Sequence, residues 1–135
     1  MMERKFSKTI SSLDDVFLFL EEFFSTANID PGSAYAISLA VEEFFTNMVK
    51  YSPESNRDIT VRARRNGDAA LVALVDEDVE PYDVSGAGTV DTTLPLEERK
   101  VGGLGIFLSK ELMDDVSYEY AGRTSTITLT KKLET

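Results

Sequence analysis

The sequence predicts a single α+β domain, a two-layer sandwich whose helices cover one face of a mostly antiparallel sheet. Three observations lead to this class. Apolar residues recur at helical spacing near the N-terminus, they alternate with polar residues in later segments, and tight turns join those segments in pairs. Strands joined by hairpins pair antiparallel, and helices on one face bury the apolar side of such a sheet. The expected order is strand, two helices, two strands, a long loop, a third helix and two strands.

Composition excludes several kinds of chemistry. The 135 residues include 14 Lys and Arg against 24 Asp and Glu, so the formal net charge is −10. Because the chain holds no Cys and no His, we exclude disulfides, thiolate zinc sites, thiol nucleophiles, imidazole bases and phosphohistidine chemistry. The negative charge disfavours nucleic-acid binding, which needs clustered Lys and Arg. With no long apolar span and no signal-peptide pattern, we expect a cytoplasmic protein without membrane contact.

A short strand over residues 3–10 and then a helix are expected first. The Ser12-x-x-Asp15 pattern is typical of a helix start. Apolar residues follow at helical spacing with acidic residues on the other side, so the helix is expected to be amphipathic. Its apolar positions are Leu13, Val16, Phe17, Leu20 and Phe24.

A second helix is predicted to begin at Asp30 and Pro31. Aspartate is a favoured N-cap residue, and proline fits the first helical position. The helix is expected to end before Pro53, which cannot continue it. Its apolar stripe consists of Ile37, Val41, Phe44 and Met48.

Two hairpins are predicted in the second half of the chain. Asn66 and Gly67 both tolerate positive φ and separate an alternating segment that begins at Ile59 from an apolar run over residues 71–75. A turn over residues 121–123 separates two further alternating segments.

Between the hairpins, a third helix is expected over residues 102–113. The loop before it, residues 83–101, is the longest segment without a clear pattern. A compact domain rarely keeps so long a loop without a use for it, so this loop is expected to be functional.

The first candidate site lies on the second helix. Glu43 and Asn47 are one helical turn apart, so they share a face about a quarter-turn from the apolar stripe. Ala36 and Ala40 lie on the same side and are expected to leave room beside them. An amide oxygen suits Mg²⁺, and a carboxylate can orient or deprotonate a hydroxyl. A solvated helix edge that carries an i, i+4 Glu–Asn pair is the alternative interpretation of this spacing.

Two further candidates follow along the chain. The acidic residues 76–83 come at the end of an apolar strand, where a carboxylate can accept a hydrogen bond from an exocyclic amine such as that of adenine. Gly102, Gly103 and Gly105 lead into the third helix, where backbone N–H groups and the helix N-terminus can bind phosphate. Taken alone, the acidic segment is better explained as an acidic turn that caps the strand. A plain flexible junction is the alternative for the second segment, although three glycines in four residues fit it less well.

Taken together and in this order, the motifs resemble the ATP-binding superfamily shared by DNA gyrase, heat-shock chaperones, MutL-type repair proteins and sensor histidine kinases. Within it, nearly the whole chain resembles the single-domain bacterial anti-sigma factor serine/threonine kinases. Residues 40–52, AVEEFFTNMVKYS, are similar to the N-box of that family, and residues 94–133 to its lid end, G2 box and closing hairpin. The resemblance implies the Bergerat fold of histidine-kinase-like ATPases, a single domain over residues 1–135 and an ATP lid over about residues 83–101.

The resemblance also implies roles for the matching residues. Glu43 would be the catalytic base and Asn47 the Mg²⁺ ligand. Asp76 would contact adenine, or Glu77 would if the register is shifted by one residue. The residues expected to bind ATP phosphates or line the cofactor site are Lys50, Arg99 (as a lid contact for the γ-phosphate), Gly102, Gly103, Leu104 and Gly105.

The G1 box departs from the family pattern. Asp78 and Glu80 stand where glycine or a neutral residue is usual, and Tyr51 replaces the histidine that commonly ends the N-box. At roughly 6 Å and an effective dielectric of 20, each extra carboxylate would repel a phosphate charge by about 3 kcal/mol. The groups expected to offset this repulsion are Mg²⁺, Lys50, Arg99 and Lys100.

The function implied by the resemblance is that of a protein kinase. It would use Mg²⁺ and ATP to phosphorylate a Ser or Thr of an anti-sigma factor antagonist with the STAS fold, and would bind a sigma factor in alternative complexes, as a homodimer. The alternative, supported by the G1 departures, is a binding module that has lost catalysis and sequesters a regulatory partner. The Glu43 and Asn47 pair argues against that alternative.

Overall fold

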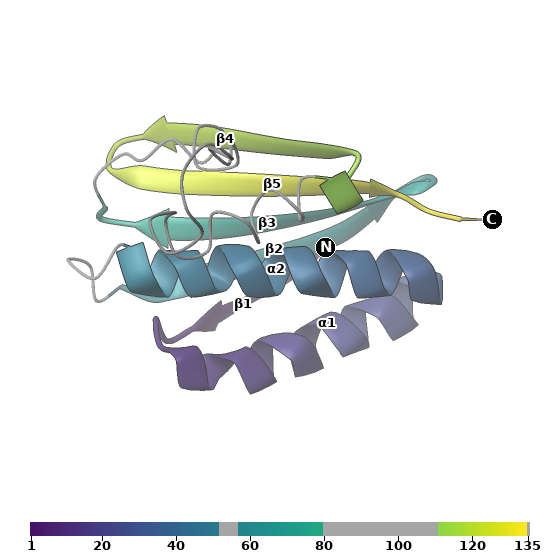
Figure 1. Ribbon diagram of the computed structural model, residues 1–135, viewed down its shortest axis with the longest axis horizontal. Helices are drawn as coiled ribbons and strands as arrows, with labels where there is room; N and C mark the ends of the chain where they lie inside the picture. The colour runs from purple at the N-terminus through teal and green to yellow at the C-terminus, as the bar shows by residue number, and fades with distance from the viewer. Residues whose placement is uncertain (52–56, 80–110, 135) are drawn as a thin grey trace, which may run out of the picture.

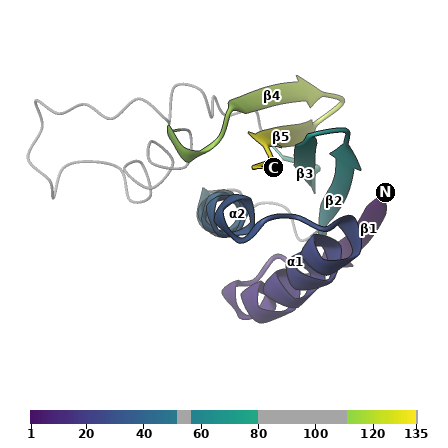
Figure 2. The ribbon, with the colours of Figure 1, turned by 90° about the vertical axis from the view of Figure 1, so that its right-hand side faces the viewer.

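The computed structural model describes residues 1–51, 57–79 and 111–134. In this part of the chain, five strands form one sheet in the order β1-β2-β3-β5-β4, and two helices cover one of its faces (Figures 1 and 2). The elements are β1 (Met2–Phe6), a 3₁₀ turn η1 (Ile10–Ser12), α1 (Leu13–Ala27), α2 (Pro31–Tyr51), β2 (Ile59–Asn66), β3 (Ala69–Glu77), β4 (Asp115–Ala121) and β5 (Thr124–Lys132).

The predicted two-layer α+β architecture is confirmed. Each strand pairing described is antiparallel. α1 packs on β1 and β2, and α2 packs on β3 and β5 in the middle of the sheet. The predicted third helix lies outside the described residues except at its end, where Glu111 and Leu112 are helical. None of the helices in the described ranges is long and apolar enough to cross a membrane.

β1 is shorter than the predicted strand over residues 3–10. It pairs with β2 from Met2, opposite Ala63, to Phe6, opposite Ile59. Because β2 begins at Ile59, the residues after Phe6 have no strand beside them, and they form a turn and η1 instead. Lys8 lies in this connecting segment.

α1 begins at Leu13, as predicted, but Ser12 does not cap it through its side chain. Ser12 has helical backbone angles, and its hydroxyl lies 3.1 Å from that of Thr9. The preceding η1 turn therefore leads directly into the helix. At the other end, Arg65 of β2 donates to the carbonyl oxygens of Ala27 and Asn28 at 2.8 and 3.0 Å, which satisfies acceptors that the helix leaves open.

The buried face of α1 is rotated from the predicted one. Phe19 and Phe23 are buried, although the predicted stripe left them out. Phe19 packs edge-to-face on Phe6 of β1, with ring centroids 5.8 Å apart. Because α1 is apolar on several sides, its contact with the sheet decides its orientation. Of the predicted positions, Val16 and Leu20 are buried, and Leu13, Phe17 and Phe24 are partly buried.

α2 begins with the predicted Asp30 cap. The Oδ2 atom of Asp30 accepts a hydrogen bond from the backbone N–H of Ser33 at 2.9 Å, and Oδ1 accepts one from that of Glu134 at 3.0 Å. Phe45 is fully buried and widens the apolar face beyond the predicted stripe. All four stripe residues are buried: Ile37, Val41, Phe44 and Met48.

Both predicted hairpins form, with one correction. Asn66 still pairs with β3, so the β2–β3 loop consists of Gly67 and Asp68, and only Gly67 has a positive φ, at 65°. Asn66 is therefore the last strand residue. In the β4–β5 hairpin, Gly122 and Arg123 form the loop at φ 58° and 61°, which matches the twist of the strands they join.

The Asp30 cap makes part of the stability pH-dependent. Hydrogen bonds from Ser33 and Glu134 hold the pKa of Asp30 below its ordinary value of 3.8. A lowered folded pKa stabilises the folded state above the unfolded pKa, and this stabilisation is lost as the pH falls through the folded pKa. We therefore expect Asp30→Asn to lower the Tm at neutral pH, and the gap from wild type to close as the pH falls from neutral through the folded pKa of Asp30.

Thermal unfolding followed by circular dichroism across this pH range checks the expectation. Asp68→Asn, in the exposed β2–β3 loop, removes the same charge without touching a helix cap. A Tm gap for Asp30→Asn that stays constant with pH would contradict the role of the ionised cap.

Candidate functional site

Glu43 and Asn47 contact each other on α2. The Nδ2 atom of Asn47 donates to the backbone carbonyl of Glu43 at 2.7 Å and to its Oε1 atom at 3.3 Å. Asn47 is buried, with 3% of its surface exposed, whereas Glu43 is partly exposed. Because the amide nitrogen is held by Glu43, the amide oxygen is the atom of Asn47 that can coordinate a cation. The i, i+4 contact itself agrees with the alternative interpretation of a helix edge, but Asn47 is buried and not solvated, which that interpretation does not expect.

The space expected beside this pair is not provided by the alanines. Ala36 and Ala40 are 5% and 0% exposed and belong to the hydrophobic core. Because these side chains are small, neighbouring core residues pack against them, and no open space is left beside them. Lys50 lies exposed in the last turn of α2.

Asp76 and Glu77 lie on opposite faces at the end of β3. Asp76 continues the inward-facing row of Val72 and Leu74 and is 1% exposed. Glu77 is partly exposed, and its Oε2 atom lies 2.9 Å from the Nη2 atom of Arg57. Of the two candidate adenine contacts, only Asp76 faces the helix layer that carries Asn47.

Asp76 is paired with a residue that the motifs did not include. The Nζ atom of Lys8 lies 2.5 Å from Oδ1 of Asp76, and the two side chains are only 4% and 1% exposed. The register explains the encounter, because Phe6 of β1 and Asp76 of β3 both lie opposite Ile59 of β2. Lys8 follows Phe6 by two residues, where the chain turns away from the sheet. Only the strand register, and no local pattern, could have indicated this pair.

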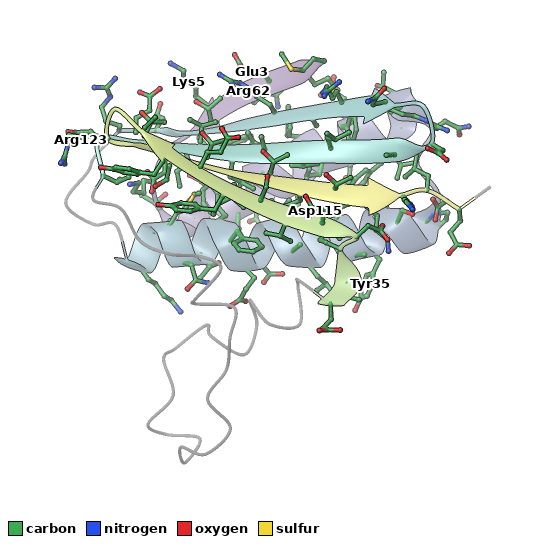
Figure 3. The ribbon with its side chains drawn as sticks, turned by 90° about the horizontal axis from the view of Figure 1, so that it is seen from above. Glu3, Lys5, Tyr35, Arg62, Asp115 and Arg123 are labelled. Atoms are coloured by element: carbon green, nitrogen blue, oxygen red, sulfur yellow. The ribbon has the colours of Figure 1, made fainter. Side chains whose placement is uncertain are left out.

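Asp78 adopts φ 58°, in the left-handed region that favours glycine. Glycine adopts such a backbone without strain, and the family pattern has glycine or a neutral residue where this chain has Asp78. The Oδ1 atom of Asp78 lies 3.0 Å from the Nε atom of Arg123, at the tip of the β4–β5 hairpin (Figure 3). Arg123 is thus a cation beside the acidic segment, and no sequence motif had indicated it.

The same hairpin holds the chain just after Asp78. The backbone N–H of Val79 donates to the carbonyl oxygen of Arg123 at 3.0 Å, and the hydroxyl of Tyr120 donates to the carbonyl oxygen of Val79 at 2.8 Å. These contacts tie the acidic segment to β4 and β5.

The remaining predicted site residues lie outside the described residues. They are Glu80, Arg99, Lys100, Gly102, Gly103, Leu104 and Gly105, together with the predicted lid over residues 83–101 and the side chain of Tyr51. Within the described ranges, no group of three or more carboxylates could hold a metal ion by itself.

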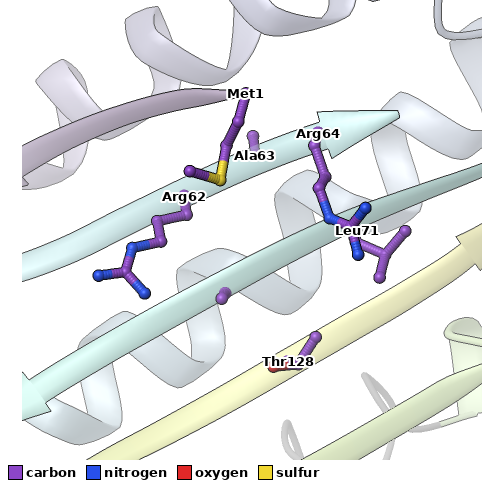
Figure 4. Close-up of a pocket in the computed structure, with 7 residues that line it drawn as sticks. Met1, Arg62, Ala63, Arg64, Leu71 and Thr128 are labelled. Atoms are coloured by element: carbon purple, nitrogen blue, oxygen red, sulfur yellow. The ribbon is translucent and has the colours of Figure 1, made fainter. Parts of the chain in front are cut away.

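One pocket lies on the other side of the sheet. It measures about 190 Å³, and Arg62 and Arg64 of β2 stand beside it on the helix-free face (Figure 4). Since Asp76 and Asn47 lie between the two layers, this pocket is separate from the candidate site. Its lining consists of Met1, Arg62, Ala63, Arg64, Leu71, Ala73 and Thr128.

Comparison with known proteins finds a family over most of the chain. Residues 6–131 match the family described as the histidine kinase-like ATPase domain. The serine-protein kinases RsbW of Listeria monocytogenes and Listeria innocua are 30% and 29% identical to the chain over 97 residues. Each match covers 62% of this chain and 57% of the relative, so the chain spans little more than half the length of these curated relatives.

Solved structures share the fold. The RsbU and RsbW domains of Rv1364c from Mycobacterium tuberculosis align with a TM-score of 0.68 and 20% identity, covering 98% of this chain and 32% of that one. The SiaB–SiaC complex from Pseudomonas aeruginosa aligns with a TM-score of 0.62 and 13% identity, covering 97% of this chain and 88% of that one. At these identities, the likeness establishes the fold.

The backbone at Asp78 leads to a stability prediction. We expect Asp78→Gly to keep the stability of wild type or raise it by up to about 1 kcal/mol, because glycine adopts positive φ without strain. The lost pair with Arg123 is half-exposed and costs little. Urea unfolding measures the change.

Glu77→Gly is the matched control for this prediction. Glu77 is the last residue of β3, where glycine costs about 0.5–1 kcal/mol. A larger loss for Asp78→Gly than for Glu77→Gly would show that the left-handed backbone is not the controlling feature.

Proposed function

Because the chain belongs to the histidine kinase-like ATPase domain family, we propose that it is an anti-sigma factor serine/threonine kinase. It binds Mg²⁺ and ATP and phosphorylates a Ser or Thr of an anti-sigma factor antagonist. The observation that carries the proposal is the ordered contact between Glu43 and Asn47. It joins a base and a cation ligand on the helix layer that the buried Asp76 also faces.

Glu43 is the proposed general base. A serine hydroxyl is a weak nucleophile at neutral pH and needs a group that accepts its proton. In a chain without His or Cys, this role falls to carboxylates, Lys or Tyr. Glu43 is accessible enough to reach a hydroxyl, and the hydrogen bond from Asn47 to its Oε1 atom orients the carboxylate.

Asn47 is the proposed Mg²⁺ ligand. Its amide oxygen is a hard donor, and its nitrogen is already held by Glu43. Mg²⁺ commonly takes one or two protein ligands and completes its shell with water and substrate phosphates, which fits a site with few carboxylates. Bound Mg²⁺ and ATP would supply the phosphoryl group and neutralise charge during its transfer.

Asp76 is the proposed adenine contact. Its position on the inner face supports this choice over Glu77, and the positive φ at Asp78 supports the same register, because the family pattern has glycine two residues after the carboxylate. We also propose that residues 83–101 form a lid within a single domain over residues 1–135. The proposed phosphate and cofactor contacts are Lys50, Arg99, Gly102, Gly103, Leu104 and Gly105.

The proposed partners are a STAS-fold antagonist, as substrate, and a sigma factor, bound by a homodimer in the cytoplasm. A relative and a structural neighbour support phosphorylation of a protein partner: RsbW is named a serine-protein kinase, and SiaB was solved in complex with SiaC.

A second candidate function comes from another class. The pairing of Lys8 with Asp76 engages the proposed adenine contact, which favours a binding module without turnover. Such a module would hold its partner by surface complementarity, and its partner affinity would not depend on ATP.

Glu43→Gln tests the proposed base. We expect phosphoryl transfer to a purified antagonist to fall by about 10²-fold or more, because the base is removed while the shape is kept. ATP and partner binding are expected to remain. Radiolabel transfer and calorimetry measure the two effects. Glu42→Gln, the exposed neighbour on α2, is the matched control and is expected to transfer normally.

Asn47→Ala tests the proposed Mg²⁺ ligand. We expect wild type to bind ATP at one saturable site in calorimetric titration, more tightly with Mg²⁺ than without it. In Asn47→Ala, the gain from Mg²⁺ is expected to disappear, because the amide oxygen is lost. Thermal unfolding controls for the loss of a buried side chain. If folded wild type binds no ATP up to about millimolar concentration, a Kd typical of weak sites, the binding-module function replaces the kinase.

A further inference from the structure

Lys8 and Asp76 form a buried ion pair at the inner face of the sheet. The Nζ atom of Lys8 lies 2.5 Å from Oδ1 of Asp76, and both side chains are almost fully buried. Lysine is rarely buried to this extent unless it is paired. Lys8 comes from the segment between β1 and α1, which the family motifs do not include.

A purely structural role explains the Lys8–Asp76 pair poorly. Taking two charges out of water is costly, and well-packed apolar residues of similar volume often hold a core equally well. The neighbouring inward positions of β3, Val72 and Leu74, are apolar and fully buried. A carboxylate and an ammonium at the end of this row therefore point to a use beyond packing.

We propose that Lys8 sets the nucleotide affinity of this chain by competing with the amino group of adenine for the carboxylate of Asp76. This inference rests on the proposed function, in which Asp76 accepts a hydrogen bond from adenine. An ammonium is a stronger donor to a carboxylate than a neutral amine, because its hydrogen bond is charge-assisted. ATP must therefore compete with a pair that is already formed, and its apparent Kd rises with the population of that pair.

Lys8→Met tests the competition, because methionine is unbranched and uncharged. We expect its Kd for ATP, measured by calorimetry with Mg²⁺, to be at least about tenfold lower than that of wild type. Purine riboside triphosphate, which lacks the 6-amino group, is the second probe, and its affinity is expected not to rise. Lys5→Met, on the exposed outer side of β1, removes the same charge and is expected to leave ATP binding unchanged (Figure 3).

The outcomes separate this inference from its alternatives. Weaker binding of both triphosphates to Lys8→Met would mean that Lys8 attracts phosphate, and equal affinities in wild type and variant would mean that the pair is structural. A gain that is the same for both triphosphates would mean that the amino group is not involved. Each of these results overturns the inference.

Lys8→Gln carries the test if Lys8→Met does not fold. Its side-chain amide can still donate to Asp76 but has no charge, so a smaller gain in ATP affinity is expected, and no gain overturns the inference.

If wild type binds ATP and neither variant gains affinity, this inference fails while the proposed function stands. If a variant binds ATP and wild type does not, the inference stands and the kinase function of the native chain fails. If none binds, both fail.

Discussion

The inward-facing row of β3 is the constraint on which the rest of the structure depends. Val72 and Leu74 are fully buried beneath the helix layer, and β3 lies at the centre of the sheet order. Because side chains alternate along a strand, the same period that buries these residues also places Asp76 on the inner face. The core and the candidate site are therefore continuous, and the register that secures one also positions the other.

Three consecutive acidic residues lie at and just after the end of this strand, and each meets a cation from a different part of the chain. Asp76 pairs with Lys8 after β1, Glu77 with Arg57 before β2, and Asp78 with Arg123 at the tip of the β4–β5 hairpin. The first pair is buried and the other two are largely exposed, so water screens the attraction between the charges least in the first pair. Each of these three carboxylates is thereby matched by a cation within the fold.

Prediction from the sequence succeeded where structure depends on local spacing. The start of α1 at Leu13, the Asp30 cap and the two hairpins were all placed by short patterns. Prediction was less accurate where several faces of a helix are apolar. In α1, Phe19 is fully buried although the predicted stripe left it out, because β1 offers Phe6 as its packing partner. β1 is shorter than predicted because its partner strand β2 begins at Ile59, opposite Phe6, so no strand lies beside the residues after Phe6.

By itself, the sequence determined the types and order of the described strands and α-helices and the shared face of Glu43 and Asn47. Periodicity, capping and i, i+4 spacing act over a few residues, so a linear sequence contains them. Only the tertiary structure decided that Asp76 faces inward, that Lys8 reaches it and that Arg123 meets Asp78. These contacts join residues that are distant in the chain. Strand register and the direction of the connecting segments bring them together, and local patterns do not specify either one.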